Sequence, residues 1–150
     1  MRALIQRVNE AKVLVENVLV DEIGKGLLIF LGIGNEDTEE DVQWLAHKII
    51  QMRIFADEEN KMNKSITDIN GDLLLVSQFT LFASIKKGNR PSFIHGAPPH
   101  QAKDLYEKFI QQCEIILQKP VAKGIFGADM KVYLINDGPV TIFIDTKNKE

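Results

Sequence analysis

The sequence contains a single cysteine, Cys113, so no disulfide can form within the chain and nothing in it requires an oxidising compartment. Its longest nearly uncharged apolar stretch, residues 26–34, is far shorter than the roughly 20 residues that a membrane-spanning helix needs. The first residues include Arg2 and Arg7 and no apolar run of signal-peptide length. These absences predict a cytoplasmic protein with no membrane partner.

The charge balance excludes a further class of protein. The 150 residues carry 18 Lys and Arg against 21 Asp and Glu, a net charge of −3. A protein that coats DNA or RNA indiscriminately depends on excess positive charge, so this chain is not expected to be one, although the balance leaves room for a local basic patch. With 45% apolar and 26% charged residues and no repeat or linker, the chain is predicted to be one globular domain, residues 1–150.

Metal and cofactor motifs are scarce as well. The three histidines, His47, His95 and His100, occur in no zinc-binding spacing. Gly32-x-Gly34 follows an apolar run, but the third glycine of a dinucleotide fingerprint is replaced by Asp37. The sequence therefore predicts no metal site and no cofactor.

No side chain stands out as a catalytic nucleophile. Ser77 lacks the Gly-x-Ser-x-Gly motif of α/β-hydrolases. Cys113 falls on the apolar stripe of a predicted helix, where burial without a nearby cation raises the pKa of a thiol. We therefore expect Cys113 to be a core residue, and the residues alone do not predict a conventional nucleophilic hydrolase.

Apolar periodicity predicts an α+β protein. Among the predicted strands, 13–15 and 18–20 flank a turn at Glu16-Asn17, and 27–31 is covered on both faces. Thr38 opens a helix, since three carboxylates and then a stripe of apolar residues follow it. A second amphipathic helix covers residues 102–117. The class is α+β, with a mostly antiparallel sheet or small barrel covered by two main helices.

Two segments are not explained by packing alone, and the first is residues 73–82, which predict a buried strand after the Asn70-Gly71 turn. An unpaired buried polar group costs about 1–3 kcal/mol, so the polar side chains of this strand either pair within the fold or line a pocket whose ligand supplies partners. Alternation would divide the side chains between two faces, with Ser77, Phe79 and Leu81 on one and Gln78, Thr80 and Phe82 on the other.

The second segment is residues 136–141, with the sequence NDGPVT. Its residue types favour a hairpin turn between strands 130–134 and 140–144. Gly138-Pro139 is also a place where a cis bond costs only about 0.5–1 kcal/mol, and such a bond would aim the neighbouring carbonyls as one rigid pair of acceptors. The sequence leaves both interpretations open.

Together these segments resemble the D-aminoacyl-tRNA deacylase family. The resemblance rests on the two signature motifs of that family, SQFT at 77–80 and N-x-G-P-V-T at 136–141, and it includes IQRV at 5–8 and GNRPSF at 88–93. It extends from Met1 to Asp145. Both motifs match the D-specific branch of bacteria and eukaryotes rather than the related animal branch.

The resemblance implies a small β-barrel-like α+β domain that acts as a homodimer. The implied activity is hydrolysis of the ester between a D-amino acid and the terminal ribose of tRNA, with glycine also removed. The Gly138-Pro139 pair is expected to be cis and to reach into the partner subunit's pocket. There its carbonyls would hold the substrate's α-amino group, and an L side chain would clash.

The resemblance also implies the site residues. Main-chain N–H groups of Phe79 and Thr80 would stabilise the oxyanion, and the ribose 2′-hydroxyl would assist the attacking water; an activated ester needs little more. Thr80 as nucleophile is a second interpretation, since no base is evident beside it. The catalytic residues would be Ser77, Gln78, Phe79 and Thr80, and the substrate-binding residues Asn136, Gly138, Pro139, Val140 and Thr141.

The basic residues expected to bind tRNA are Lys86, Lys87 and Arg90, and ordinary solvated charges are the alternative. Lys119 and Lys123 are further candidates, whereas Ile125 stands where the family often has a basic residue. No DNA partner is expected.

Two competing functions are also considered. A non-catalytic dimeric nucleic-acid-binding module would use the loop at 86–90 and would bind RNA with strong salt dependence but no turnover. A thiol hydrolase acting through Cys113 would lose its activity on alkylation.

Overall fold

A computed structural model describes residues 1–149 of the chain. Its main sheet has six strands in the order β2-β1-β3-β6-β7, with β8 also paired to β1, and β4 and β5 form a separate two-stranded ribbon. The elements are β1 (Arg2–Val15), β2 (Val18–Ile23), β3 (Gly26–Gly32), α1 (Glu39–Gln51), β4 (Phe55–Ala56), β5 (Met62–Lys64), β6 (Asp72–Ser77), the 3₁₀ helix η1 (Phe79–Phe82), α2 (Pro99–Leu117), β7 (Ala122–Lys123) and β8 (Met130–Asp145).

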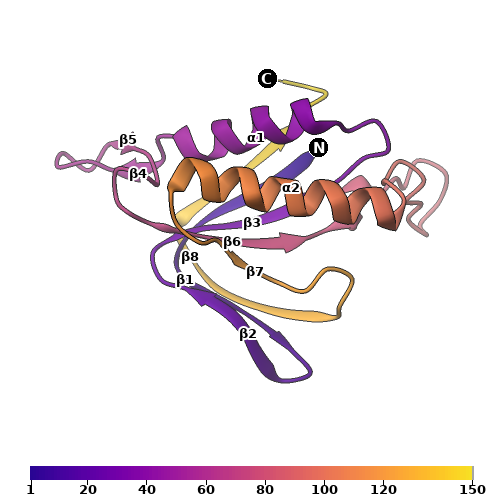
Figure 1. Ribbon diagram of the computed structural model, residues 1–150, viewed down its shortest axis with the longest axis horizontal. Coiled ribbons are helices and arrows are strands. Elements are labelled where there is room, and N and C mark those ends of the chain that lie inside the picture. Colours follow the sequence, from indigo (N-terminus) through magenta and orange to yellow (C-terminus); the bar gives the residue numbers. More distant parts are fainter. Residues whose placement is uncertain (150) are drawn as a thin grey trace.

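The sheet is mixed, and it curls into a nearly closed, barrel-like shape (Figure 1). β1 pairs antiparallel with β2, β3 and β8, whereas β3–β6 and β6–β7 are parallel. A parallel pair needs a crossover, and α1 lies in the connection from β3 to β6. The expected turn at Glu16-Asn17 is confirmed, because both residues have positive φ, as a two-residue hairpin of this kind requires.

The two helices lie side by side across one face of the sheet (Figure 1). α1 begins after Thr38, whose hydroxyl and N–H both donate to Asp41, so the predicted start is confirmed. Cys113 of α2 is fully buried, and both faces of β3 are covered, as predicted. The α+β prediction, with a barrel-like sheet and two covering helices, is confirmed.

The prediction of one strand over residues 73–82 is wrong beyond Ser77. Gln78 N–H donates to the Leu31 carbonyl at 2.8 Å, and because β3 ends at Gly32 the ladder then stops. The chain bends at Gln78 (φ −143°, ψ 78°) into η1. The assignment of residues 77–82 to two strand faces is therefore wrong too, and Thr80 is exposed rather than buried.

The predicted hairpin turn at residues 136–139 is also wrong. β8 runs antiparallel to β1 on both sides of this segment, with Thr141 opposite Gln6 and Asn136 opposite Val8. The intervening residues bulge outward around Arg7, and the chain then continues in the same direction. The bulge leaves Gly138 and Pro139 exposed, and β8 does not reverse direction there.

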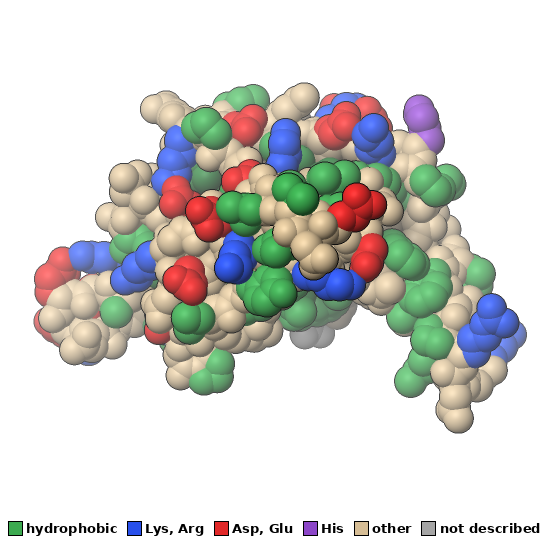
Figure 2. Space-filling model, turned by 90° about the horizontal axis from the view of Figure 1, so that it is seen from below, with side chains coloured by type: hydrophobic (Ala, Val, Ile, Leu, Met, Phe, Trp, Pro, Cys, Tyr) green, Lys and Arg blue, Asp and Glu red, His purple; other side chains and the backbone are tan. Residues whose placement is uncertain are grey.

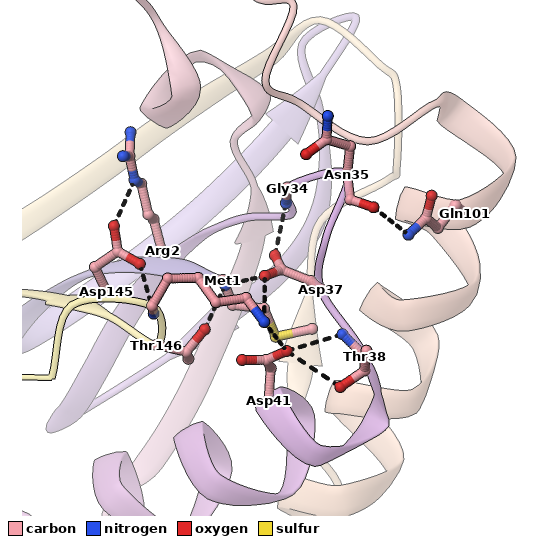
Figure 3. Close-up of polar contacts among 11 residues, drawn as sticks. Met1, Arg2, Gly34, Asn35, Asp37, Thr38, Asp41, Gln101, Asp145 and Thr146 are labelled. Carbon is pink, nitrogen blue, oxygen red and sulfur yellow. Dashed lines mark hydrogen bonds and ion pairs between the residues drawn. The ribbon is translucent and has the colours of Figure 1, made fainter.

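A buried ionic contact joins the start of β1 to the loop after β3 (Figure 3). The Met1 ammonium lies 2.5 Å from Asp37 Oδ1 and 2.6 Å from Thr146 Oγ1, and Asp37 Oδ2 accepts the Gly34 N–H at 2.6 Å. Both Met1 and Asp37 are buried. The Met1 ammonium thus connects the start of β1 to the loop after β3 and to the segment after β8, which are distant in the sequence.

Asp41 belongs to the same region. Burial alone would raise its pKa, but hydrogen bonds from Lys147 and Thr146 outweigh burial and hold the pKa of this carboxyl well below its ordinary value. Lys147 Nζ lies 2.8 Å from Asp41 Oδ2. The Asp41 carboxylate is therefore charged at neutral pH and paired with Lys147.

Candidate active site

A cavity of about 500 Å³ opens where β3 and β6 end. Its walls come from the ends of these strands, η1, the segment before α2, the first turn of α2 and the segment that leads into β8. The lining is mainly apolar. It consists of Leu31, Ile33, Val76, Ser77, Gln78, Phe79, Phe93, Gly96, Ala97, Pro99, Ala102, Phe126, Gly127, Ala128, Met130 and Val132.

The SQFT residues lie at this cavity in different ways. Ser77, Gln78 and Phe79 line it, and the Phe79 ring meets Phe93 edge to face at 5.1 Å between centroids. Thr80 does not line it; its exposed hydroxyl accepts a hydrogen bond from the Gln78 amide. An amide cannot take a proton from a hydroxyl, so Thr80 has no general base in this arrangement.

Two main-chain donors are free at the start of η1. The first hydrogen bond of this turn runs from Leu81 N–H to the Gln78 carbonyl at 3.3 Å. The N–H groups of Phe79 and Thr80 precede that bond, and neither has an acceptor among residues 1–149. Two adjacent unpaired N–H groups are the arrangement that stabilises an oxyanion.

The turn that presents these donors is held from behind. A Cβ on Gly32 would lie 2.9 Å from the Gln78 carbonyl oxygen, and one on Gly34 would lie 2.8 Å from the Phe82 ring, so η1 packs directly on glycine backbone. Arg2 Nη1 donates to the Leu81 carbonyl at 2.9 Å, and its guanidinium stacks over Phe82 at 4.5 Å. Gly32 and Gly34 are therefore packing glycines, since a Cβ at either position would meet η1 or the residue before it.

The NDGPVT segment is held by its own side chains and by Arg7. Val140 N–H donates to Asn136 Oδ1 at 3.1 Å, and Asn136 Nδ2 donates to Thr141 Oγ1 at 2.9 Å. The Gly138–Pro139 bond is cis, and Gly138 has φ +124°. Arg7 Nε lies 3.2 Å from the Asp137 carbonyl and 3.1 Å from its carboxylate.

The two motifs do not meet within one chain. None of residues 136–141 lines the cavity that Ser77, Gln78 and Phe79 line. Residues 136–141 lie beside Gln6 and Val8, in the middle of β1. The SQFT segment lies at the other end, near Arg2, the first residue of β1. Within a single chain, then, only the SQFT half of the predicted site is at the cavity.

The predicted basic residues project from a hairpin beside the cavity. Ser84 and Ser92 exchange backbone hydrogen bonds of 2.8 and 2.9 Å, and Lys86, Lys87 and Arg90 lie exposed between them. Figure 2 shows this projection at the lower right of the view, with blue side chains on its outer side. Residues 73–103 contain no Asp or Glu at all, in a chain whose net charge is −3.

The other basic candidates differ from this hairpin. Lys119 pairs with Asp72 at 2.8 Å, so its charge is already partnered. Lys123 is exposed on β7, at the edge of the sheet path. Ile125 is half exposed beside Phe126 of the cavity wall, so this position adds apolar surface next to the cavity.

Several parts of the site were missed from the sequence. Phe93, Ala102 and Phe126 form parts of the cavity wall. Ala102 lies in the predicted helix over residues 102–117, and no local pattern marks any of the three as a neighbour of SQFT. Arg7 did carry a signal, since its charged side chain interrupts the mainly apolar residues 3–8. That signal indicates a buried polar contact, and the structure supplies one with Asp137.

Other chemistries find little support among residues 1–149. They include no cluster of three or more His, Cys, Asp or Glu side chains that could hold a metal ion. Burial, with a smaller effect of Glu114, raises the pKa of Cys113 to about 12, so its thiol is protonated and unreactive at neutral pH. No helix in this part of the chain is both long enough and apolar enough to cross a membrane.

Comparison with known proteins agrees with the fold and the motifs. A model of the family described as D-Tyr-tRNA(Tyr) deacylase matches residues 4–145. The D-aminoacyl-tRNA deacylase of Cytophaga hutchinsonii is 59% identical over the whole of both chains, and that of Thermotoga petrophila is 53% identical over 97% of each.

Among solved structures, one named c-Myc DNA Unwinding Element Binding Protein superposes with a TM-score of 0.93 at 39% identity, covering 97% of this chain and 99% of the other. A probable eukaryotic D-amino acid tRNA deacylase, at 19% identity, shares the fold with a TM-score of 0.82 over 95% of this chain and 97% of that one. A full-length relative above 50% identity and a family match over nearly the whole sequence leave one conclusion. The chain belongs to the D-aminoacyl-tRNA deacylase family.

Proposed function

We propose that the whole chain, residues 1–150, is one deacylase domain that hydrolyses the ester of D-aminoacyl-tRNA to a free D-amino acid and tRNA. The observation that carries this proposal is the pair of unbonded N–H groups of Phe79 and Thr80 at a largely apolar cavity that offers no nucleophile with a base. Such a site suits a substrate that is already activated, and an aminoacyl ester is one. Membership of the deacylase family supports the same reaction.

In this reaction water attacks the ester carbonyl and the carbonyl oxygen becomes a tetrahedral oxyanion. The N–H groups of Phe79 and Thr80 stabilise that charge, which is worth about 3–4 kcal/mol per donor in related acyl-transfer sites. The oxyanion then collapses, the bond to the ribose oxygen breaks, and that oxygen takes the proton. The 2′-hydroxyl of the terminal ribose assists the water, so the protein contributes position and electrostatics. Ser77 and Gln78 orient the ester at the cavity wall.

The site is completed by a second copy of the chain. β8 pairs only with β1 among residues 1–149, so its other edge is open along its length. Tyr133, Ile135 and Phe143 are each about half exposed on this strand. A long apolar edge strand is a liability in a monomer unless another surface covers it. A homodimer covers β8 and brings the NDGPVT segment of one chain to the cavity of the other.

The NDGPVT segment supplies the chiral selection. The exposed Gly138 and Pro139 carbonyls hold the α-amino group of the substrate, with Asn136, Val140 and Thr141 as their support. An L side chain would point into this segment and clash, whereas a D side chain points away. Glycine has no side chain to exclude, so glycyl-tRNA is also a substrate.

Lys86, Lys87 and Arg90 bind the tRNA. None of the three forms an ion pair among the described residues, and the 73–103 stretch around them is free of acidic side chains. A small basic region on an acidic protein permits release after turnover.

The proposal is tested by incubating the protein with D-tyrosyl-tRNA and L-tyrosyl-tRNA in parallel and following the release of tyrosine. We expect rapid hydrolysis of the D ester and a rate for the L ester close to the uncatalysed one. Equal hydrolysis of both esters, or none of the D ester, would overturn the function.

The same assay separates this function from the alternative of a non-catalytic nucleic-acid-binding module. The 39% identical protein is named for DNA binding. A binding module would retain intact D-tyrosyl-tRNA and release it only as salt is raised, whereas an enzyme returns deacylated tRNA at every salt concentration at which it turns over.

Thr80→Ala is expected to lower the rate of D-tyrosyl-tRNA hydrolysis by no more than about tenfold, because the main-chain N–H group remains and the hydroxyl has no base to activate it. Single-turnover rates of the variant and the parent measure this. A complete loss of hydrolysis in a variant with an unchanged melting temperature would instead identify the Thr80 hydroxyl as the nucleophile.

A further inference from the structure

The hairpin at residues 84–92 combines two kinds of exposed side chain. Its tip carries Lys86, Lys87 and Arg90, and aliphatic side chains flank its base, with Ile85 69% and Ile94 75% exposed. In Figure 2 the projection shows blue side chains on its outer side, green ones on the side toward the body, and no red ones. A solvated charge run would not need exposed aliphatic neighbours.

This combination favours one form of nucleic acid over another. A duplex presents its phosphates outward and hides the faces of its bases, so it offers nothing to Ile85 and Ile94. A single strand presents phosphates together with unstacked bases, and proteins bind it with cations beside apolar or aromatic surface. The hairpin therefore matches a single strand.

Position leads to the same choice. Phe93 lines the cavity, and Arg90 precedes it by three residues. The backbone of Arg90 therefore lies at most about 10 Å from that of Phe93, the span of three extended residues. At roughly 3.4 Å or more per nucleotide along a strand, that separation spans only a few nucleotides. The phosphates within reach of the hairpin are those next to the nucleotide in the cavity.

We infer that this hairpin binds the unpaired nucleotides immediately before the terminal adenosine of the substrate, and not the acceptor duplex. The inference rests on the proposed function, since that function places the aminoacylated adenosine at the cavity. Lys86, Lys87 and Arg90 contact the phosphates of this single strand. Ile85 and Ile94 pack against its bases, so a short RNA end contains everything that the hairpin recognises.

The test compares three esters of D-tyrosine: adenosine without a phosphate, a short single-stranded RNA ending in CCA, and intact tRNA. The variant is Lys86→Gln/Lys87→Gln/Arg90→Gln. Its control is Lys25→Gln/Lys48→Gln/Lys149→Gln, which removes three exposed charges that form no ion pair with any of residues 1–149 and lie outside the 73–103 stretch. For each protein the ratio of kcat/KM on the short RNA to that on the adenosine ester is measured at several salt concentrations.

In the hairpin variant we expect this ratio to fall at least about tenfold at low salt, and the salt slope for the short RNA to flatten by about 2, at roughly 0.7 per lost phosphate contact. The ratio of kcat/KM on intact tRNA to that on the adenosine ester should fall by the same factor. The control variant should keep both parental ratios. A loss confined to intact tRNA would place the hairpin on the duplex and overturn the inference.

Two other results would also overturn it. Unchanged kcat/KM values on all three esters would mean that the hairpin cations are only solvated charges. An equal fall of kcat/KM on all three esters, the adenosine ester included, would mean that the hairpin shapes the cavity. The proposed function is judged separately, by whether the parent protein hydrolyses the adenosine ester of D-tyrosine but not that of L-tyrosine.

Discussion

Gly138→Ala is expected to lower hydrolysis of D-tyrosyl-tRNA by at least about 100-fold, the effect of misplacing a positioning group by about 1 Å. Gly138 has φ +124°, which an L residue rarely adopts, and an added Cβ would lie 2.9 Å from Arg7 Nη2 and 3.0 Å from Val140 Cγ2. The segment must therefore shift away from Arg7, and its carbonyls shift with it. The side of the segment that moves is exposed, so the core is not disturbed.

The measurement is single-turnover hydrolysis together with the melting temperature of the variant. Gly24→Ala is the matched control, since a Cβ there meets nothing within 4 Å and its φ is ordinary. The control should retain parental activity. Gly138→Ala with a rate within about threefold of the parent, at an unchanged melting temperature, would show that the segment does not hold the substrate.

Asp37→Asn should produce the largest loss of stability of the single substitutions considered. It leaves the buried Met1 ammonium, 2.5 Å away, without its counter-charge. Breaking a buried ion pair in this way costs about 3–5 kcal/mol, which for a domain of this length corresponds to a fall in melting temperature of about 10 °C. The substitution also weakens the Gly34 N–H contact, and Gly34 lies against Phe82 behind the active-site turn.

Thermal unfolding followed by circular dichroism measures this loss. Asp129→Asn is the control: Asp129 pairs with Lys131 at 2.9 Å, but its side chain is 86% exposed, so that pair should contribute less than about 1 kcal/mol. Equal melting temperatures for the two variants would show that the buried Met1–Asp37 ion pair stabilises the fold no more than the exposed Asp129–Lys131 pair does.

Local patterns were enough for the helices and for the strands of the core. Thr38 with its following carboxylates marks the start of α1, and the apolar run at 27–31 marks a strand covered on both faces; each signal is contained within a few residues. The end of β6 has no such signal. Residues 78–82 leave the sheet because β3 ends beside them, and that partner lies more than forty residues earlier in the chain.

The site was predictable in part for the same reason. Both motifs are visible in the sequence, but the bulge at 136–139 depends on pairing with β1 across the sheet, so turn residues there suggested a hairpin that does not exist. Asp37 is one carboxylate in an acidic run that suits the start of a helix, and its role as the partner of Met1 needs the whole fold. In both cases the structure depends on a partner that is distant in the sequence, so no local pattern predicts it.

The proposed active site takes its SQFT half from one chain and its NDGPVT half from another, and subunit complementation tests this sharing most directly. Ala102→Trp fills the cavity of its own chain, since Ala102 lines it, and leaves residues 136–141 intact. Gly138→Ala disables that segment and leaves the cavity intact. Each variant alone should be inactive, and Gln111→Trp, on the exposed side of the same helix, should be active.

The two inactive variants are mixed in denaturant in equal amounts, refolded together and assayed with D-tyrosyl-tRNA. Random pairing places one intact site in each mixed dimer, so the mixture should recover about a quarter of the parental activity. The same variants refolded separately and then combined should recover less, to the extent that subunits do not exchange. A mixture no more active than the sum of its parts would contradict the shared site.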